Sequence, residues 1–115
     1  MKKYFLFIAL ALMSITCLRA QETIRVGAKH FTEGYILSEI LSQLLEDAGY
    51  KVDRKYNLGG TTVCFEALRN EAIDVYPEYT GTLAEEILKS EGRLDFNELQ
   101  SRLNKELAME ISRSE

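Results

Sequence analysis

The sequence is poor in the residue types that catalytic and metal centres require. Its 115 residues include one histidine and two cysteines. His30 has no second histidine beside it, so a zinc site or a Ser-His-Asp triad would be incomplete within this chain. Cys64 lacks a CxxC partner, and we expect it to be a small buried residue rather than a metal or redox group. These shortages argue against an enzyme and against a bound cofactor.

Proline and flexible tracts are also scarce. Pro77 is the only proline, and no Pro/Gly-rich linker, internal repeat or low-complexity tract divides the chain. The run Gly59-Gly60-Thr61-Thr62 lacks the lysine and the spacing of a P-loop, and no GxGxxG motif is present. We therefore predict one small domain over residues 21–115.

The first twenty residues have the layout of a secretory signal peptide. Lys2 and Lys3 form a positively charged start, residues 4–13 are almost entirely apolar, and residues 14–20 become smaller and more polar. The apolar run is too short for a transmembrane helix, which needs roughly 20 apolar residues. We predict cleavage after Ala20 and export to the periplasm. Cys17 offers the alternative of a membrane-anchored lipoprotein, although the residues before it fit that signal poorly.

Acidic residues outnumber basic ones in the predicted mature chain. Without Lys2, Lys3 and Arg19 there are 11 Lys+Arg against 18 Asp+Glu, a net charge of −7. A negative surface argues against nucleic acid and anionic lipid headgroups as partners. Cleavage would also remove Cys17 and leave Cys64 as the only cysteine, so no internal disulfide is expected.

Hydrophobic periodicity predicts alternating strands and helices. Residues 24–28, 51–56 and 72–76 alternate apolar and polar side chains, as strands do. The clearest helix begins near Thr32 and ends before Gly49. Its apolar residues recur at helical spacing on one face: Ile36, Leu37, Ile40, Leu41, Leu44, Leu45 and Ala48.

Three further helices are predicted in the second half of the chain. Thr61 or Thr62 is expected to cap a helix over residues 63–70, and a short helix is expected from Thr82 to residue 89. Asp95 followed by Glu98 resembles a capping box. The last helix then has an apolar side made by Phe96, Leu99, Leu103 and Leu107.

The order β-α-β-α-β-α-α predicts an α/β domain with a parallel sheet and helices on its faces. In such sheets ligands bind beyond the carboxyl ends of the strands. Three loops meet this description: residues 29–34, 58–62 and 77–82. A sheet of three strands has two open edges, and no return segment follows before Glu115, so we expect a truncated form of a larger protein.

These loops carry residues suited to a small zwitterion. The predicted helix starts at Thr61-Thr62 and Thr82 offer hydroxyls and backbone N–H groups to a carboxylate, and Lys29 adds a positive charge. Tyr79 offers an aromatic face to a cation such as a quaternary ammonium group. Tyr76, at the end of a predicted strand, is expected to pack inside instead.

Three segments together resemble the glycine betaine/choline/carnitine-binding proteins, the solute receptors of osmoprotectant ABC transporters. Residues 26–34 (VGAKHFTEG) are similar to the family's VGSKxFTEQ opening. Residues 57–62 (NLGGTT) and 73–82 (IDVYPEYTGT) are similar to its next two motifs. The resemblance covers nearly all of the chain after residue 20. Gly34 stands where glutamine is usual, and His30 where asparagine is common.

The resemblance implies a type II periplasmic-binding-protein-like fold, of which this chain would form an incomplete first lobe with a short parallel sheet flanked by helices. It implies that Lys29 and Thr82 bind the ligand carboxylate and that Tyr79 forms one wall of an ammonium cage. A member of the family passes its solute to an ABC transporter permease driven by an ATPase, without chemistry on the ligand.

Two other functions stay open on the sequence alone. One is a receptor for another small zwitterion, such as an amino acid, and the other is a fragment of a periplasmic enzyme whose active site lies elsewhere. Glu33, Asp74 and Glu78 are the candidate acids or bases for an enzyme, but we expect Asp74 to order the backbone. We also expect residues 21–115 alone to bind glycine betaine or choline weakly or not at all.

Overall fold

The computed structural model describes residues 21–111. The predicted leader, its cleavage site and Cys17 therefore lie outside the described residues. Within residues 21–111, no helix combines the length and the apolar character needed to cross a membrane.

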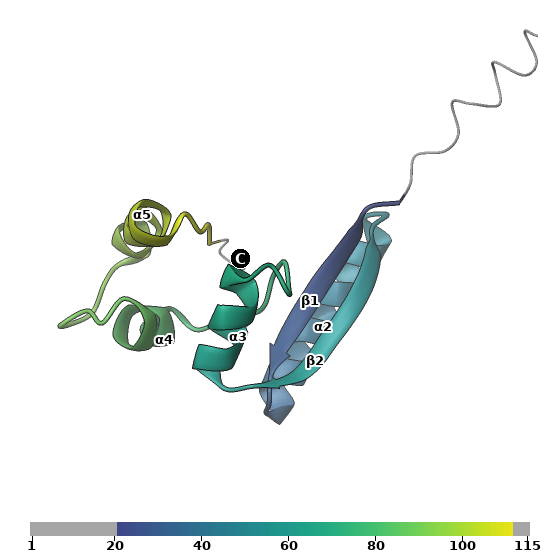
Figure 1. The fold of residues 1–115 in the computed structure, drawn as a ribbon, viewed down its shortest axis with the longest axis horizontal. Coiled ribbons are helices and arrows are strands. Elements are labelled where there is room, and N and C mark those ends of the chain that lie inside the picture. The colour runs from purple at the N-terminus through teal and green to yellow at the C-terminus, as the bar shows by residue number, and fades with distance from the viewer. Residues whose placement is uncertain (1–20, 112–115) are drawn as a thin grey trace, which may run out of the picture.

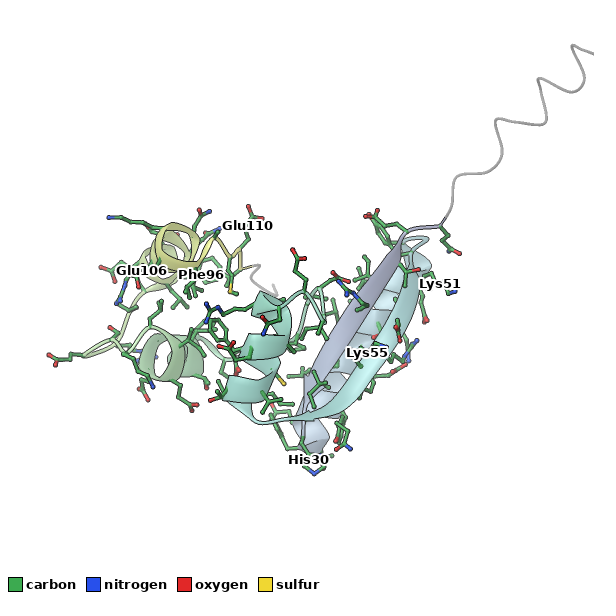
Figure 2. The ribbon with its side chains drawn as sticks, in the orientation of Figure 1. His30, Lys51, Lys55, Phe96, Glu106 and Glu110 are labelled. Carbon is green, nitrogen blue, oxygen red and sulfur yellow. The ribbon has the colours of Figure 1, made fainter. Side chains whose placement is uncertain are left out.

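A βαβ unit forms the first half of the described chain. Strand β1 (Thr23–Lys29) leads through helix α2 (Thr32–Asp47) to strand β2 (Lys51–Gly59), which runs parallel to β1 (Figure 1). A φ of 96° at Gly49 lets the chain turn back after the helix, as predicted. His30 and Lys51 lie at opposite ends of the sheet (Figure 2). The two predicted strands and the helix between them are confirmed.

The predicted third strand over residues 72–76 is wrong. Within residues 21–111, a single isolated parallel bridge joins Val75 to Val26, and β1 and β2 form a two-stranded sheet. The Gly27 N–H donates to the Val75 carbonyl over 2.8 Å. The next donor along β1, the Arg25 N–H, instead bonds the Asp74 carboxylate at 2.7 Å. Because a side chain takes the place of a strand carbonyl, the ladder stops after one bridge, and Asp74 orders the backbone as expected.

The face of α2 that packs on the sheet is small and polar. Gly34, Ser38 and Ser42 are its buried residues, and their spacing of four aligns them along the helix. The Ser38 hydroxyl donates to the Gly27 carbonyl over 2.8 Å. A Cβ at Gly34 would lie 2.8 Å from the Lys29 carbonyl oxygen. Small residues therefore allow the helix to approach β1 closely.

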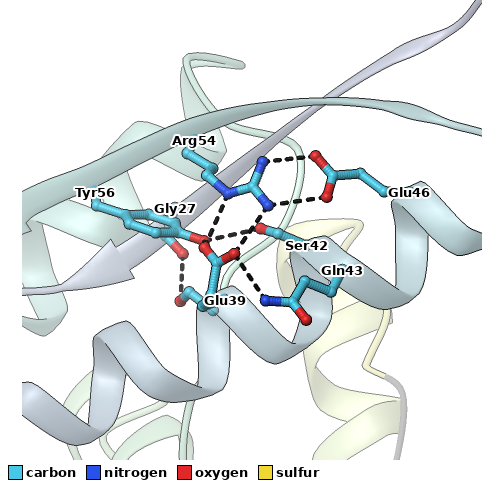
Figure 3. A network of polar contacts seen from close by, with 8 residues as sticks. Gly27, Glu39, Ser42, Gln43, Glu46, Arg54 and Tyr56 are labelled. Atoms are coloured by element: carbon cyan, nitrogen blue, oxygen red, sulfur yellow. Dashed lines mark hydrogen bonds and ion pairs between the residues drawn. The ribbon is translucent and has the colours of Figure 1, made fainter.

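An ion-pair network links α2 to β2 beside this face (Figure 3). Arg54 donates to Glu39 over 2.9 Å and to Glu46 over 2.7 Å. The Tyr56 hydroxyl donates to Glu39 over 3.0 Å and shares a 2.8 Å hydrogen bond with Ser42. Hydrogen bonds from Arg54 are the main reason that the pKa of Glu39 falls to about 2. The network therefore keeps Glu39 ionised at acidic pH values at which an ordinary glutamate would be protonated.

The opposite face of α2 is apolar and exposed. Ile36, Ile40 and Leu44 are 55%, 52% and 62% exposed, and Leu37 is 37% exposed. At 3.6 residues per turn, these side chains point away from the two buried serines. Four of the apolar residues that predict the helix are therefore turned away from the sheet, and Leu41 and Leu45 are half-buried.

Helix α3 (Thr61–Arg69) follows β2 and packs against both strands. Its N-cap is Gly60, in an extended conformation, and no side chain caps it. The predicted cap at Thr61 or Thr62 is wrong because both threonines already lie in the first helical turn. Cys64 on this helix is fully buried, which confirms the packing role predicted for it.

The remaining helices form a separate core. Helix α4 (Thr80–Thr82) continues into the π-helix η2 (Leu83–Ile87), so this segment begins two residues earlier than predicted. Helix α5 (Phe96–Leu107) packs against them, and this unit lies beyond α3 from the sheet (Figure 1). The capping box of Asp95 and Glu98 is confirmed. The core residues of this helical unit are Leu83, Ala84, Leu88, Leu99 and Leu103.

Candidate ligand-binding site

The three loops predicted to hold the site meet at the carboxyl end of the sheet. Lys29, the last residue of β1, pairs with Gly59, the last residue of β2. The His30 N–H donates to the Gly59 carbonyl over 2.9 Å, which fixes the first loop to the second. The bridge of Val75 to Val26 brings the third loop to the same end. Parallel pairing thus gathers segments about 30 and 50 residues apart in the chain.

Lys29 lies at the centre of this cluster. The residue is 8% exposed, and its Nζ lies 2.7 Å from Glu78 Oε1 and 3.4 Å from Thr61 Oγ1. A charged group this buried needs an opposite charge, and Glu78 supplies it. Lys29 and Thr61 were predicted site residues, whereas the pairing of Lys29 with Glu78 was not predicted from the sequence. The signal that could have indicated this pair is the general requirement that a buried lysine have an oppositely charged partner.

Glu78 also shapes the third loop. Its Oε1 accepts a hydrogen bond from the Tyr79 N–H at 2.9 Å. Its Oε2 and the Tyr76 hydroxyl are both buried without a hydrogen-bond partner among the described residues. Burial, and next the charge of Glu78, raise the pKa of Tyr76 above its ordinary value. Tyr76 therefore packs inside, as predicted, and stays a neutral phenol.

Two aromatic rings face the Lys29 ammonium. Its Nζ lies 5.3 Å from the centre of the Phe31 ring and 5.4 Å from the centre of the Tyr79 ring, both within range of a cation–π interaction. Both rings are more than one-third exposed. A hydrogen bond to Glu33 is the main cause of the raised pKa of Tyr79. Phe31 was not singled out from the sequence, although it lies in the first motif.

The structure brings Lys29, Thr61 and Tyr79 together but does not add the other two predicted residues to their contacts. Thr62 is exposed in the first turn of α3, and Thr82 is half-buried at the end of α4. Neither hydroxyl appears in a hydrogen bond within residues 21–111. Their assignment to the site stays a prediction.

His30 occupies the outer edge of the cluster, where it is exposed. Its Nδ1 lies 2.7 Å from the Tyr35 hydroxyl, which donates to Asn57 Oδ1 over 3.1 Å. This chain of contacts joins the first loop to the end of β2. Across residues 21–111, no group of three or more His, Cys, Asp or Glu side chains is placed to hold a metal ion.

Comparison with known proteins gives a consistent result. Residues 22–112 match the family model described as the substrate binding domain of ABC-type glycine betaine transport system. The glycine betaine-binding protein YehZ of Escherichia coli is 42% identical over 64 residues, which is 56% of this chain and 21% of that protein. The carnitine transport binding protein OpuCC of Listeria monocytogenes is 43% identical over 77 residues, 61% of this chain and 25% of that protein.

A longer alignment and a solved structure extend these matches. The ergothioneine transport permease/ergothioneine binding protein EgtU of Helicobacter pylori is 38% identical over 106 residues, 89% of this chain and 19% of that protein. The structure of apo YehZ from E. coli matches 72% of this chain and 32% of its own length, with a TM-score of 0.65 and 30% identity. The predicted α/β periplasmic-binding-protein fold is confirmed. The chain spans about a quarter or less of the length of these curated relatives.

Proposed function

The chain belongs to the family of substrate-binding domains of ABC-type glycine betaine transport systems, and from this premise we propose that it serves the capture of a quaternary-ammonium osmoprotectant, such as glycine betaine or choline, for import. The family consists of transport substrate-binding domains, and we propose that this chain likewise does no chemistry on its ligand. Its partners would be an ABC transporter permease and the ATPase that drives it.

The two exposed aromatic rings support the ammonium half of the ligand. Phe31 and Tyr79 already stand within about 5.4 Å of a cation, the Lys29 ammonium. A quaternary ammonium group has no N–H donors, so aromatic faces suit it better than hydrogen-bond acceptors do. Glu33 and Glu78 add negative charge around these rings. This wall of rings beside a cation is the observation that carries the proposal.

The carboxylate group of the ligand would be bound by Lys29, Thr61 and the start of α3. An ammonium group has three N–H donors, and Glu78 and Thr61 accept from two of those of Lys29. The third donor can turn toward a carboxylate, and the free N–H groups in the first turn of α3 offer it further hydrogen bonds. We propose that Thr62 and Thr82 add hydroxyl donors at the rim.

We further propose that residues 1–20 direct export to the periplasm and are removed, with lipidation at Cys17 as the alternative. Residues 21–115 would form part of the first lobe of a two-lobed receptor. The opposite wall of the cage would then come from the part of the longer relatives that this chain does not span. On this basis we expect millimolar rather than micromolar affinity from this chain alone.

Ligand titrations followed by NMR chemical shifts test this proposal, because they detect millimolar binding. The panel is glycine betaine, choline, carnitine and ergothioneine, with glycine as the amine that lacks quaternary methyl groups. We expect shifts at residues 29–31, 61 and 79 with the quaternary ligands and none with glycine. Tyr79→Ala should weaken binding by about 1–2 kcal/mol, between the values of an exposed and a desolvated cation–π contact, while Tyr79→Phe keeps most of it.

Tyr50→Ala is the matched control, since Tyr50 is a comparably exposed tyrosine beyond the C-terminal end of α2. Equal losses from Tyr50→Ala and Tyr79→Ala would remove Tyr79 from the site. Stronger shifts with glycine than with glycine betaine would favour an amino-acid receptor. Micromolar binding by this chain alone would show that the site is already complete.

A further inference from the structure

We infer that the exposed face of α2 is the docking surface for a second, basic-flanked helix, supplied by the part of a substrate-binding protein that the longer relatives have and this chain does not span. This surface, the outer stripe, consists of Ile36, Leu37, Ile40 and Leu44. Contiguous exposed apolar surface of this kind marks an interaction site in a water-soluble domain. The inference rests on family membership and on α2 itself, and does not depend on the identity of the ligand.

The geometry of the outer stripe fits a helix. Ile36, Ile40 and Leu44 follow one another at intervals of four residues and form a ridge along α2. Ridges of this spacing pack into the grooves between ridges of another helix. The inner face of α2 is already occupied, because Ser38 and Ser42 bond β1 and β2. Docking on the outer stripe therefore requires no rearrangement of the βαβ unit.

Charge defines the chemistry of the docking helix. Residues 32–47 contain no lysine or arginine, and the helical repeat places Glu33 and Asp47 in line with the outer stripe at its two ends. The last turn of α2 has no basic residue to offset the partial negative charge of the helix C-terminus. A helix with apolar residues in the middle and a lysine or arginine opposite Asp47 complements this surface.

The same charges argue against two other occupants. In an antiparallel pair of α2 helices Glu33 of one copy would face Asp47 of the other, and in a parallel pair each carboxylate would face itself. Like charges in contact oppose a second copy of this chain. Helices that lie on lipid surfaces carry lysine and arginine around their apolar face, and α2 carries none.

The relatives supply enough additional chain for this role. The match to apo YehZ covers 32% of that protein, so about two-thirds of its length lies outside the part that resembles this chain. A segment of that remainder packed on the outer stripe would remove the exposed isoleucines and leucines from water. This remainder is long enough to supply the docking helix without a contribution from the permease.

A complementation experiment tests the inference without ligand. The purified chain is titrated calorimetrically with a separate polypeptide comprising the part of E. coli YehZ that this chain does not match. We expect a one-to-one complex whose affinity falls at least about tenfold, or 1.4 kcal/mol, with Ile40→Lys. Val63→Lys is the matched control, because Val63 on α3 is 50% exposed, close to the 52% of Ile40. It should change the affinity by less than about twofold, which corresponds to about 0.4 kcal/mol.

A pair of synthetic helical peptides tests the charge rule and decides the question if the YehZ polypeptide does not fold. Both peptides carry the same leucine ridge, one with lysine and one with glutamate at its ends. The lysine peptide should bind more tightly, and the double variant Glu33→Lys, Asp47→Lys should reverse the preference. Equal binding of the two peptides, or equal losses from Ile40→Lys and Val63→Lys, would overturn the inference. Two further results would overturn it. One is self-association of the chain that Ile40→Lys abolishes, and the other is co-sedimentation with phosphatidylglycerol vesicles that Ile40→Lys abolishes.

Discussion

Helices α2 and α5 are both amphipathic, but the apolar side is buried on α5 and exposed on α2. On α5 the apolar side is buried, with Leu99 and Leu103 at 0% and 1% exposure against η2. On α2 the apolar side faces outward, with Ile40 and Leu44 more than half exposed. An apolar stripe therefore predicts a helix, but whether it is buried depends on a second surface of matching shape and charge.

The inner face of α2 explains the difference. β1 and β2 are joined to this helix by hydroxyl and carbonyl groups and by the Arg54 ion pairs. Such contacts require a close approach, which Gly34 and the two buried serines permit. Ile36, Leu37, Ile40 and Leu44 are left exposed on the far side, whereas Leu41 and Leu45 are half-buried. α5 packs mainly by its leucines, with a hydrogen bond of 3.2 Å from Arg102 to the Leu88 carbonyl beside them.

The largest expected effect is a loss of the α5 core. Leu103→Ala should lower the free energy of unfolding by about 2–4 kcal/mol, because it removes a buried side chain and leaves a cavity. Urea unfolding followed by far-UV circular dichroism measures the change. Leu44→Ala makes the same chemical change on α2 and should cost less than about 1 kcal/mol. Equal losses would show that the two stripes are equally buried in solution.

A smaller loss is expected where α2 approaches β1. Gly34→Ala places a Cβ 2.8 Å from the Lys29 carbonyl oxygen, and the resulting shift of the helix should cost about 1–2 kcal/mol in spite of the gain in helix propensity. Thermal unfolding of the variant is the measurement. At Gly81 a Cβ meets nothing within 4 Å, so Gly81→Ala should leave stability unchanged or slightly raised. The opposite ranking would refute the close approach.

Acid should loosen the attachment of α2 to β2. The pKa of Glu39 is lowered from 4.5 to about 2, so its stabilising contribution is complete above pH 4.5 and is lost as the pH falls toward 2. Urea midpoints measured from pH 7 to pH 3 should decline, and Glu39→Gln should decline less. Glu106→Gln is the control, because Glu106 pairs with Arg102 at the surface of α5. Its urea midpoint should still fall between pH 7 and pH 3 nearly as much as that of the unchanged chain. A parallel decline in Glu39→Gln would contradict this role of the network.

The smallest effect is expected on the outer stripe. Ile40→Gln replaces a half-exposed side chain with a polar one of similar length, and the free energy of unfolding should change by less than about 0.5 kcal/mol. Thermal unfolding of this chain at two concentrations checks both stability and self-association. A loss above 1 kcal/mol would mean that the outer stripe is covered within this chain.

The sequence predicted the elements whose evidence is local. The helix over residues 32–47, the capping box at Asp95 and the turn at Gly49 depend on contacts between near neighbours. The sequence also predicted that three loops meet at one end of the sheet. An alternating order of strands and helices is nearly always connected as parallel βαβ units, which place these loops at the same end. The motifs of these loops were enough to indicate the family.

Tertiary contacts decided the rest. Glu78 meets Lys29 across 49 positions of sequence, and Asp74 replaces a strand carbonyl at the same separation from Arg25. Neither pairing leaves a periodic signal, because each depends on where distant backbones lie and on the need of buried charges for partners. The sequence by itself determined that α2 is a helix with one apolar face. Only the packing decided that most of this face turns away from the sheet, because Gly34, Ser38 and Ser42 form the buried face that meets the strands.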